Sequence, residues 1–188
     1  MPVSKREQLV ETAMRLFCSD GFQRVGIDRI VAEAGVAKMT LYNHFKSKDE
    51  LVLAALRRRD ELFRNNFSRQ VEAAADTAAG RLAALFDVLH AWINSDDFNG
   101  CMFCNAAAEY RDASSPIRAL AAEHKRLMLA YIRLLAEQAG AEHPEGLAEH
   151  LNLLLEGAIS QALTASDLDA AKTAARAARV VLDTLPKQ

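Results

Sequence analysis

The sequence predicts an all-α protein of about nine helices. Apolar residues recur every three or four positions along most of the chain, and no segment shows the strict alternation of a half-buried strand. Helix breakers are few, with 8 Gly and 4 Pro among 188 residues. A hydrophobic content of 51% is enough for a substantial core in one or two domains.

The first helix is predicted to begin after Ser4. Ser4 as N-cap and Glu7 three residues later form a capping box, which satisfies two backbone N–H groups at the helix start. An apolar face follows at helical spacing and consists of Leu9, Ala13, Leu16 and Phe17. Gly21 ends the helix, because glycine takes a left-handed conformation after a helix at little cost.

A short helix, a tight turn and a second short helix are predicted over about residues 27–46. The first helix covers about residues 27–34, with Gly26 as its cap and an inward face formed by Ile30, Val31 and Ala34. Gly35 supplies the turn, and Val36 packs beneath it. This arrangement can place the second helix in the major groove of DNA.

The second short helix covers about residues 37–44 and directs Leu41 and Phe45 toward the core. Its other sides carry polar and flexible groups that can reach phosphates and base edges, on Lys38, Met39, Thr40, Tyr42, Asn43 and His44. The sequence therefore favours a DNA-binding regulator over an enzyme.

A long helix is predicted to start at Lys48, behind a second capping box formed by Ser47 and Glu50. The Lys48 ammonium and the free N–H groups at that helix start can bind a phosphate. This helix continues to about residue 75, and further helices are predicted over about residues 79–93, 101–110, 115–139, 145–165 and 168–185.

The N-terminal region resembles the DNA-binding domain of TetR-type (TetR/AcrR) transcriptional regulators. The similarity covers about residues 4–64 and rests on Gly21-Phe22, Ala34-Gly35-Val36, Leu41-Tyr42 with Phe45, and Lys48 with Glu50-Leu51. Two positions depart from the family pattern. Ala37 stands where the family often has a capping Ser, and Met39 replaces a common small residue, so Met39 is expected to touch a base directly.

The resemblance implies a repressor that binds an inverted-repeat operator in double-stranded DNA as a homodimer and releases it when a small-molecule effector binds. It implies a DNA-binding domain over residues 4–64 and a ligand-binding and dimerisation domain over residues 65–188. In the family, the final two helices of each subunit form a four-helix bundle across a two-fold axis.

The last two predicted helices carry wide apolar stripes. One consists of Leu147, Leu151, Leu154, Leu155, Ala158, Ile159 and Ala162, and the other of Ala170, Ala171, Ala174, Ala175, Ala177, Ala178, Val181 and Leu185. We expect these stripes to form the homodimer interface; the alternative is that they form the core of a single subunit.

A mostly apolar ligand cavity is expected between the helices of the second domain. Its predicted lining consists of Phe63, Phe67, Leu89, Trp92, Phe103, Tyr110, His124 and Met128. Polar groups available to it are His90, Asn105, Glu109 and His124. For each residue taken singly, the alternative is ordinary core packing.

Cys101 and Cys104 form a Cys-x-x-Cys pair at the start of a predicted helix. Structural packing is one interpretation, thiol sensing that would make the regulator redox-responsive is a second, and a zinc site with His90 or His124 is a third. The segment GCMFCNAAAE resembles a stretch found in a subset of the same regulators, which favours packing, and no metal or cofactor is expected.

The formal net charge of −2 is distributed unevenly. Residues 1–69 hold 13 Lys and Arg against 9 Asp and Glu, whereas residues 70–188 hold 10 against 16. A basic N-terminal third suits the phosphate field of DNA. No apolar run is long enough for a membrane span, no signal peptide is recognisable and the 3 Cys are an odd number, so we expect a cytoplasmic protein.

Overall fold

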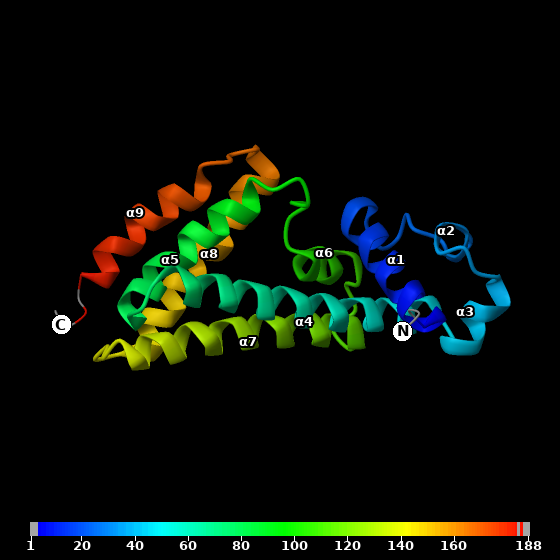
Figure 1. Cartoon of the computed structure of the whole chain (residues 1–188), viewed down its shortest axis with the longest axis horizontal. Coiled ribbons are helices and arrows are strands. Elements are labelled where there is room, and N and C mark those ends of the chain that lie inside the picture. The colour runs from blue at the N-terminus through cyan, green and yellow to red at the C-terminus, as the bar shows by residue number, and fades with distance from the viewer. Residues whose placement is uncertain (1–3, 184, 186–188) are drawn as a thin grey trace. The chain divides into compact units, whose positions relative to one another are not determined.

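The computed structural model describes residues 4–183 and 185, and these residues form nine α-helices and no strand (Figure 1). The helices are α1 (Lys5–Asp20), α2 (Ile27–Glu33), α3 (Lys38–His44), α4 (Lys48–Ala74), α5 (Ala78–Ile93), α6 (Met102–Glu109), α7 (Pro116–Gln138), α8 (Pro144–Ala165) and α9 (Ala170–Leu182). The all-α prediction is confirmed. The last helix ends at Leu182 rather than at residue 185; residue 184 and residues 186–188 of the predicted second domain lie outside the described residues.

The chain forms two compact units. Unit 1 combines the residues up to Phe63 with Cys101–His124, and unit 2 combines Arg64–Gly100 with the residues from Lys125 onward. Unit 1 thus contains α6 in addition to the predicted DNA-binding helices. None of the helices in the described residues combines the length and apolarity of a membrane-spanning helix.

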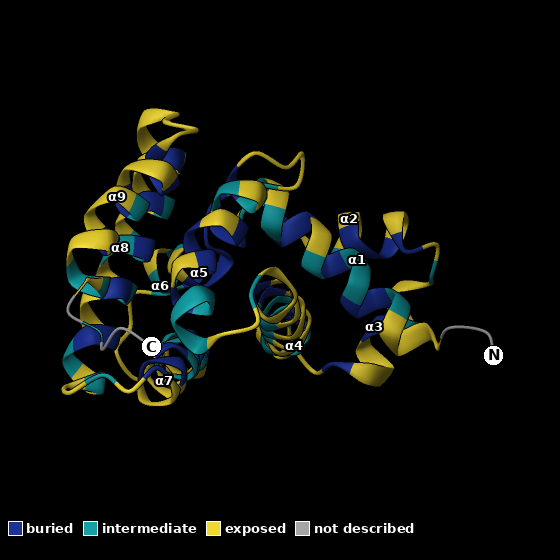
Figure 2. Ribbon diagram, turned by 60° about the vertical axis from the view of Figure 1, so that its left-hand side comes forward, coloured by how far each residue is buried: buried dark blue, intermediate teal, exposed yellow. Residues whose placement is uncertain are grey.

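Helix α1 begins with the predicted capping box. The Ser4 hydroxyl accepts a hydrogen bond from the Glu7 N–H at 3.1 Å, and the Glu7 carboxylate accepts one from the Ser4 N–H at 2.9 Å. These hydrogen bonds lower the pKa of Glu7. The predicted apolar face is buried, as the dark blue stripe of α1 shows in Figure 2, and comprises Leu9, Ala13, Leu16 and Phe17.

Gly21 ends α1 with a φ of 82° and a ψ of 163°, and its N–H donates to the Phe17 carbonyl at 3.2 Å. The positive φ was predicted, but the extended ψ takes Gly21 out of the left-handed helical region into one that only glycine occupies readily. The chain turns there, so that the Phe22 ring stacks on Phe17 with 5.1 Å between centroids.

We expect Gly21→Ala to lower the free energy of unfolding by about 1–3 kcal/mol, because a Cβ makes this backbone conformation unfavourable. The added Cβ would also lie 3.0 Å from a carboxylate oxygen of Glu109. Chemical denaturation measures the effect. The matched control is Gly146→Ala, where a Cβ meets nothing within 4 Å and the helix gains up to about 1 kcal/mol. Equal stability of the two variants would contradict the strain at Gly21.

Helices α2 and α3 pack on α1 to form the predicted three-helix arrangement. Gly26 caps α2 without a side-chain hydrogen bond, and Gly35 has a φ of 61° in the turn that follows. The apolar residues expected to face inward are buried: Ile30, Val31, Ala34, Leu41 and Phe45. Burial of these side chains holds the unit together more than the exposed ion pairs between α1 and α2 do, since such pairs contribute little.

The start of α4 departs from the predicted capping box. The Ser47 hydroxyl accepts a hydrogen bond from the Glu50 N–H at 3.2 Å, as expected. The Glu50 carboxylate, however, accepts from the N–H of Lys46 at 2.8 Å rather than from that of Ser47. Glu50 therefore satisfies a backbone donor one residue earlier than in a standard capping box.

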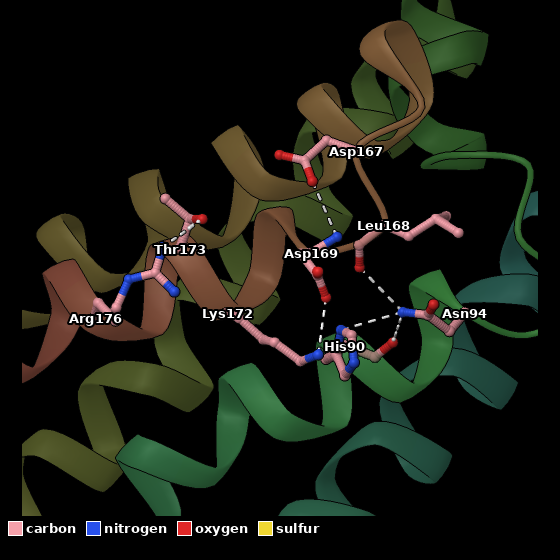
Figure 3. A network of polar contacts seen from close by, with 8 residues as sticks. All are labelled: His90, Asn94, Asp167, Leu168, Asp169, Lys172, Thr173 and Arg176. Carbon is pink, nitrogen blue, oxygen red and sulfur yellow. Dashed lines mark hydrogen bonds and ion pairs between the residues drawn. The ribbon is translucent and has the colours of Figure 1, made fainter.

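In unit 2, α5, α8 and α9 pack against one another. Figure 3 shows the polar contacts that fasten the α8–α9 turn to the end of α5. The Asn94 amide donates to the Leu168 carbonyl at 3.1 Å and to the His90 carbonyl at 2.9 Å. Asp169 pairs with Lys172 at 2.8 Å in the first turn of α9, and this hydrogen bond lowers the pKa of Asp169. His90 therefore contributes to a turn, with its ring 3.1 Å from the Asn94 amide nitrogen.

The apolar stripes of the last two helices pack inside unit 2. On α8 the buried members are Leu147, Leu151, Leu155, Ala158 and Ala162, and on α9 they are Ala170, Ala171, Ala174 and Ala178. These buried members fit the alternative interpretation, a core within one subunit, because packing of α5, α8 and α9 covers them. The large apolar residues that α8 and α9 leave exposed lie outside the predicted stripes, and include Leu153 and Val180 at 68% and 72% exposure.

Candidate DNA-binding site

Helix α3 exposes the side chains that the sequence assigns to DNA. Met39 and Tyr42 are 69% and 47% exposed although both are large apolar or aromatic groups. Lys38, Asn43 and His44 are also exposed, and Thr40 is half-buried. Leu41 and Phe45 anchor the opposite side of the helix in the core. The helix is therefore fixed on one face, while its other sides carry a varied set of mostly exposed hydrogen-bonding and apolar groups.

Lys38 forms an ion pair with Asp28 of α2, with 2.7 Å between the Lys38 Nζ and a carboxylate oxygen. The hydrogen bond to Asp28 raises the pKa of Lys38. Both side chains are more than half exposed, so the pair contributes little to stability. A phosphate can replace Asp28 as the partner of Lys38 at small cost.

Lys48 stands half-buried at the first position of α4. Burial lowers its pKa, and the neighbouring carboxylates of Asp49 and Glu109 oppose that effect. A phosphate at the start of α4 would stabilise the ammonium further and meet the partial positive charge of the helix N-terminus.

Ala37 caps α3 without a side-chain hydrogen bond. This is the consequence expected from the missing Ser at that position. The first N–H groups of α3 therefore lack a hydroxyl partner from the cap residue, and α3 depends for its stability on the burial of Leu41 and on the turn through Gly35.

The three consecutive arginines of α4 have different environments. Arg58 pairs with Glu11 of α1 at 2.8 Å and with Glu61 of its own helix at 3.2 Å. The Arg59 guanidinium lies 5.7 Å from the centre of the Phe63 ring. Arg57 is exposed. Arg58 thus links α1 to α4, whereas Arg57 is exposed at the surface and Arg59 packs on the Phe63 ring.

Glu109 lies beside the DNA-binding helices, which differs from its predicted place. The sequence predicts it as a polar group of the ligand cavity, but its carboxylate accepts hydrogen bonds from the backbone N–H groups of Phe22 and Gln23, at 3.0 and 2.7 Å. The last residue of α6 thus holds the turn between α1 and α2. No local pattern predicts this contact, because the partners are 86 and 87 residues apart.

Tyr110 follows Glu109 and also contacts the DNA-binding helices rather than the other predicted cavity residues. Its ring packs edge-on against Phe22 with 6.0 Å between centroids, and its hydroxyl lies 3.4 Å from an Asp49 carboxylate oxygen. Burial, with Asp49 as a further cause, raises the pKa of Tyr110 to about 12. The phenol therefore remains protonated and can donate toward Asp49 at neutral pH.

Three of the predicted ligand-binding residues meet in unit 1. His124 is 4% exposed and lies parallel to the Phe103 ring with 3.7 Å between centroids, while Phe63 packs edge-on against it at 5.9 Å. The His124 Nδ1 lies 2.7 Å from a carboxylate oxygen of Asp60. An imidazole buried between aromatic rings and held by a carboxylate can recognise a polar group on an otherwise apolar molecule.

The remaining predicted ligand-binding residues lie in unit 2. Phe67 and Leu89 are buried, and Met128 is half-buried. Trp92 is half-buried and packs edge-on against Phe98 with 5.1 Å between centroids. Unit 2 also holds the half-buried Tyr131, whose hydroxyl oxygen is buried and has no hydrogen-bond partner among the described residues. Their role in ligand binding stays a prediction.

All three cysteines lie among the described residues, and none of them forms a disulfide. Cys101 is the buried N-cap of α6, and Cys104 is exposed in the first turn of the same helix. Within the described part of the chain, no three His, Cys, Asp or Glu side chains are placed to hold a metal ion.

The fold and the exposed face of α3 define a helix-turn-helix DNA-binding regulator. A family model described as "Bacterial regulatory proteins, tetR family" matches residues 9–55, and one described as "Tetracyclin repressor-like, C-terminal domain" matches residues 78–178. Together these matches cover more than half of the chain, and the protein belongs to the TetR family of transcriptional regulators.

Individual relatives agree with this assignment. The HTH-type transcriptional regulator LmrA of Bacillus subtilis is 29% identical over 165 residues, which cover 86% of this chain and 88% of LmrA. The crystal structure of SCO4454, a TetR-family regulator from Streptomyces coelicolor, superposes with a TM-score of 0.85 at 34% identity and covers 97% of this chain and 96% of that one.

The reduced form of Escherichia coli NemR shares the fold, with a TM-score of 0.84 at 22% identity over 94% of this chain and 95% of that one. The protein is accordingly a transcriptional regulator and not an enzyme.

Proposed function

We propose that this protein is a homodimeric repressor that binds an inverted-repeat operator through α3 and the start of α4, and that a small molecule releases it. The observation that carries the proposal is the exposed set of DNA-reading side chains on α3, held by a buried apolar face on the same helix. Tyr42 and Met39 are the largest of these exposed groups.

The proposed contacts divide into two kinds. Lys38 and Lys48 bind phosphates, which fixes the register of the protein on DNA without reading sequence. Thr40, Tyr42, Asn43 and His44 reach base edges or phosphates, and Met39 packs against a base or a thymine methyl.

Dimerisation is proposed to use the face of α8 and α9 that packing within the subunit leaves open. On α8, Leu153, Gly157, Ser160 and Thr164 recur at spacings of three and four and share one side of the helix. Val180 is the most exposed large apolar residue of α9. A two-fold interface brings the same side chains together from both subunits, and it places two α3 helices for successive major grooves.

The effector is proposed to be a largely apolar molecule with a polar group. Support comes from the buried imidazole of His124 between the Phe63 and Phe103 rings, with Asp60 fixing its orientation. Such a ligand releases DNA only if it binds more tightly to the conformation that does not fit the operator.

The proposal is tested by adding a library of hydrophobic and amphipathic compounds to the protein bound to a fluorescent operator duplex. A compound of the right class should lower the fluorescence anisotropy to that of free DNA and should raise the melting temperature of the protein. Compounds that raise the melting temperature while DNA affinity stays constant would contradict ligand-controlled release.

A second candidate function replaces the ligand by oxidation of Cys101 and Cys104. It is favoured by one observation: Cys104 is exposed in the first turn of α6, next to a second cysteine at the N-cap of that helix. A helix N-terminus can lower the pKa of a thiol and so increase its reactivity.

Under the ligand-release proposal, we expect mild peroxide to leave DNA affinity unchanged within about twofold, because release then depends on ligand binding and not on thiol oxidation. The measurement is operator binding before and after peroxide for the wild type and for the Cys101→Ser and Cys104→Ser variants. Loss of binding in the wild type that either substitution prevents would instead establish thiol sensing.

A further inference from the structure

The segment joining α1 to α2 has two backbone donors that its own secondary structure leaves unused. Gly21 ends α1, and the N–H groups of Phe22 and Gln23 project away from the helix toward α6. Both donate to one side chain, the carboxylate of Glu109, at 3.0 and 2.7 Å. A carboxylate that receives two backbone hydrogen bonds defines the position of a turn more closely than a single neutral bond does.

The α1–α2 turn also leaves little room for a side chain at Gly21. A Cβ on Gly21 would lie 3.0 Å from the Glu109 carboxylate, so the turn and the carboxylate fit closely. The next residue, Tyr110, packs on Phe22, and Phe22 is fully buried against Phe17 of α1. The end of α6 therefore fixes the turn through a polar contact and an aromatic contact side by side.

Helix α6 is also fixed at its other end. Phe103, in its first turn, stacks on His124 of α7, and His124 is held by Asp60 of α4. A helix of eight residues is too short to be stable alone, so these two end contacts determine where it lies. The α1–α2 turn in turn sets the entry of the chain into α2 and hence the position of α3.

We propose that Glu109 is a positioning residue for DNA binding, which holds the α1–α2 turn so that α3 is presented in the orientation that fits the operator. This inference deepens the proposed function and rests on it. Glu109 is not expected to touch DNA, and its effect passes through the turn.

The direction of the change in DNA affinity distinguishes a positioning role of Glu109 from a direct effect of its charge. Glu109 is a negative charge in a basic part of the chain, close enough to Lys48 to influence the pKa of its ammonium. Removing a carboxylate from a DNA-binding surface should by charge alone leave DNA affinity equal or raise it. A positioning role predicts the opposite, a loss of affinity.

The test uses Glu109→Gln, which keeps the size but accepts only one of the two hydrogen bonds, and Glu109→Asp, which keeps the charge but is one methylene shorter. The exposed Glu123 of α7 supplies the matched control, Glu123→Gln, which removes the same charge without a contact to the turn. Each full-length variant is measured for operator affinity over a salt series, and for hydrogen exchange at the Phe22 and Gln23 amides without DNA.

We expect amide exchange at Phe22 and Gln23 to become at least about tenfold faster in both Glu109 variants. Operator affinity should fall at least about fivefold with an unchanged salt slope, since no phosphate contact is lost. Glu123→Gln should leave both quantities within about twofold.

Unchanged exchange in both variants would overturn the inference, because the contact would not hold the turn. Faster exchange with unchanged or tighter DNA binding would also overturn it, and would leave the proposed function intact. If Glu109→Gln does not fold, Glu109→Asp decides on the same two readouts. Failure of the proposed function is distinguishable, because the wild type would then bind no operator while its amide protection remained.

Discussion

Operator binding should weaken at least about tenfold when either Tyr42 or Lys48 is replaced by Ala. Each substitution acts in both half-sites of a two-fold operator, and one lost contact costs about 1–3 kcal/mol per half-site. Tyr42 is exposed on α3, and Lys48 begins α4, so neither truncation creates a cavity in the core. The melting temperature should therefore stay within a few degrees of the wild-type value.

The two substitutions should differ in how they weaken binding. Lys48→Ala removes a phosphate contact, so it should weaken binding to all sequences about equally and reduce the slope of log affinity against log salt by about one per half-site. Tyr42→Ala should leave that slope nearly unchanged. The matched control is Arg126→Ala on the exposed side of α7, which removes a cation from unit 2 outside the proposed dimer interface. Wild-type affinity in both the Tyr42 and Lys48 variants would show that α3 and the start of α4 are not the reading surface.

Leu153→Glu should convert the dimer into a monomer at micromolar concentration. In a two-fold interface the substitution occurs twice, and each copy both removes a leucine that the interface would bury and places a carboxylate in that apolar contact. We expect the dimer to be at least about a hundredfold weaker, and Val180→Glu to act in the same direction. Both side chains are exposed in the subunit, at 68% and 72%, so the fold of the subunit should survive.

The measurement is sedimentation equilibrium or size-exclusion chromatography with light scattering, followed by operator binding. Leu134→Glu is the matched control, because Leu134 is a similarly exposed leucine of α7 outside the proposed interface. That variant should stay dimeric and bind DNA. A dimeric Leu153→Glu protein would locate the interface on another face.

The local signals of the sequence were sufficient for the DNA-binding helices. The capping box of Ser4 with Glu7, the positive φ of Gly21, the turn at Gly35, and the burial of the apolar residues in α1, α2 and α3 were all predicted and are confirmed. Each of these features depends on residues within about one helical turn of each other. Helix propensity, capping and apolar spacing act over that range, so all three favour the same helices without any tertiary contact.

Local sequence signals could not predict the contacts between segments that are far apart in the chain. Glu109 and its backbone partners are more than 80 residues apart, and His124 and Asp60 are separated by 64. The periodicity of α8 and α9 correctly identified an apolar face on each helix, but an apolar face does not reveal its partner. Packing within unit 2 covers much of those faces, and the surface that we propose for a second subunit is the one around Leu153 and Val180.

We propose that this protein reads a two-fold DNA site through α3. The most direct test is nuclease footprinting of the purified full-length protein on the DNA upstream of its own gene and across a genome-wide pull-down library, each over a salt series. We expect a protected inverted repeat, with half-sites one helical turn or more apart and affinity that falls steeply as salt rises. Protection without two-fold symmetry, or no sequence-specific protection at low salt in either pool, would contradict it.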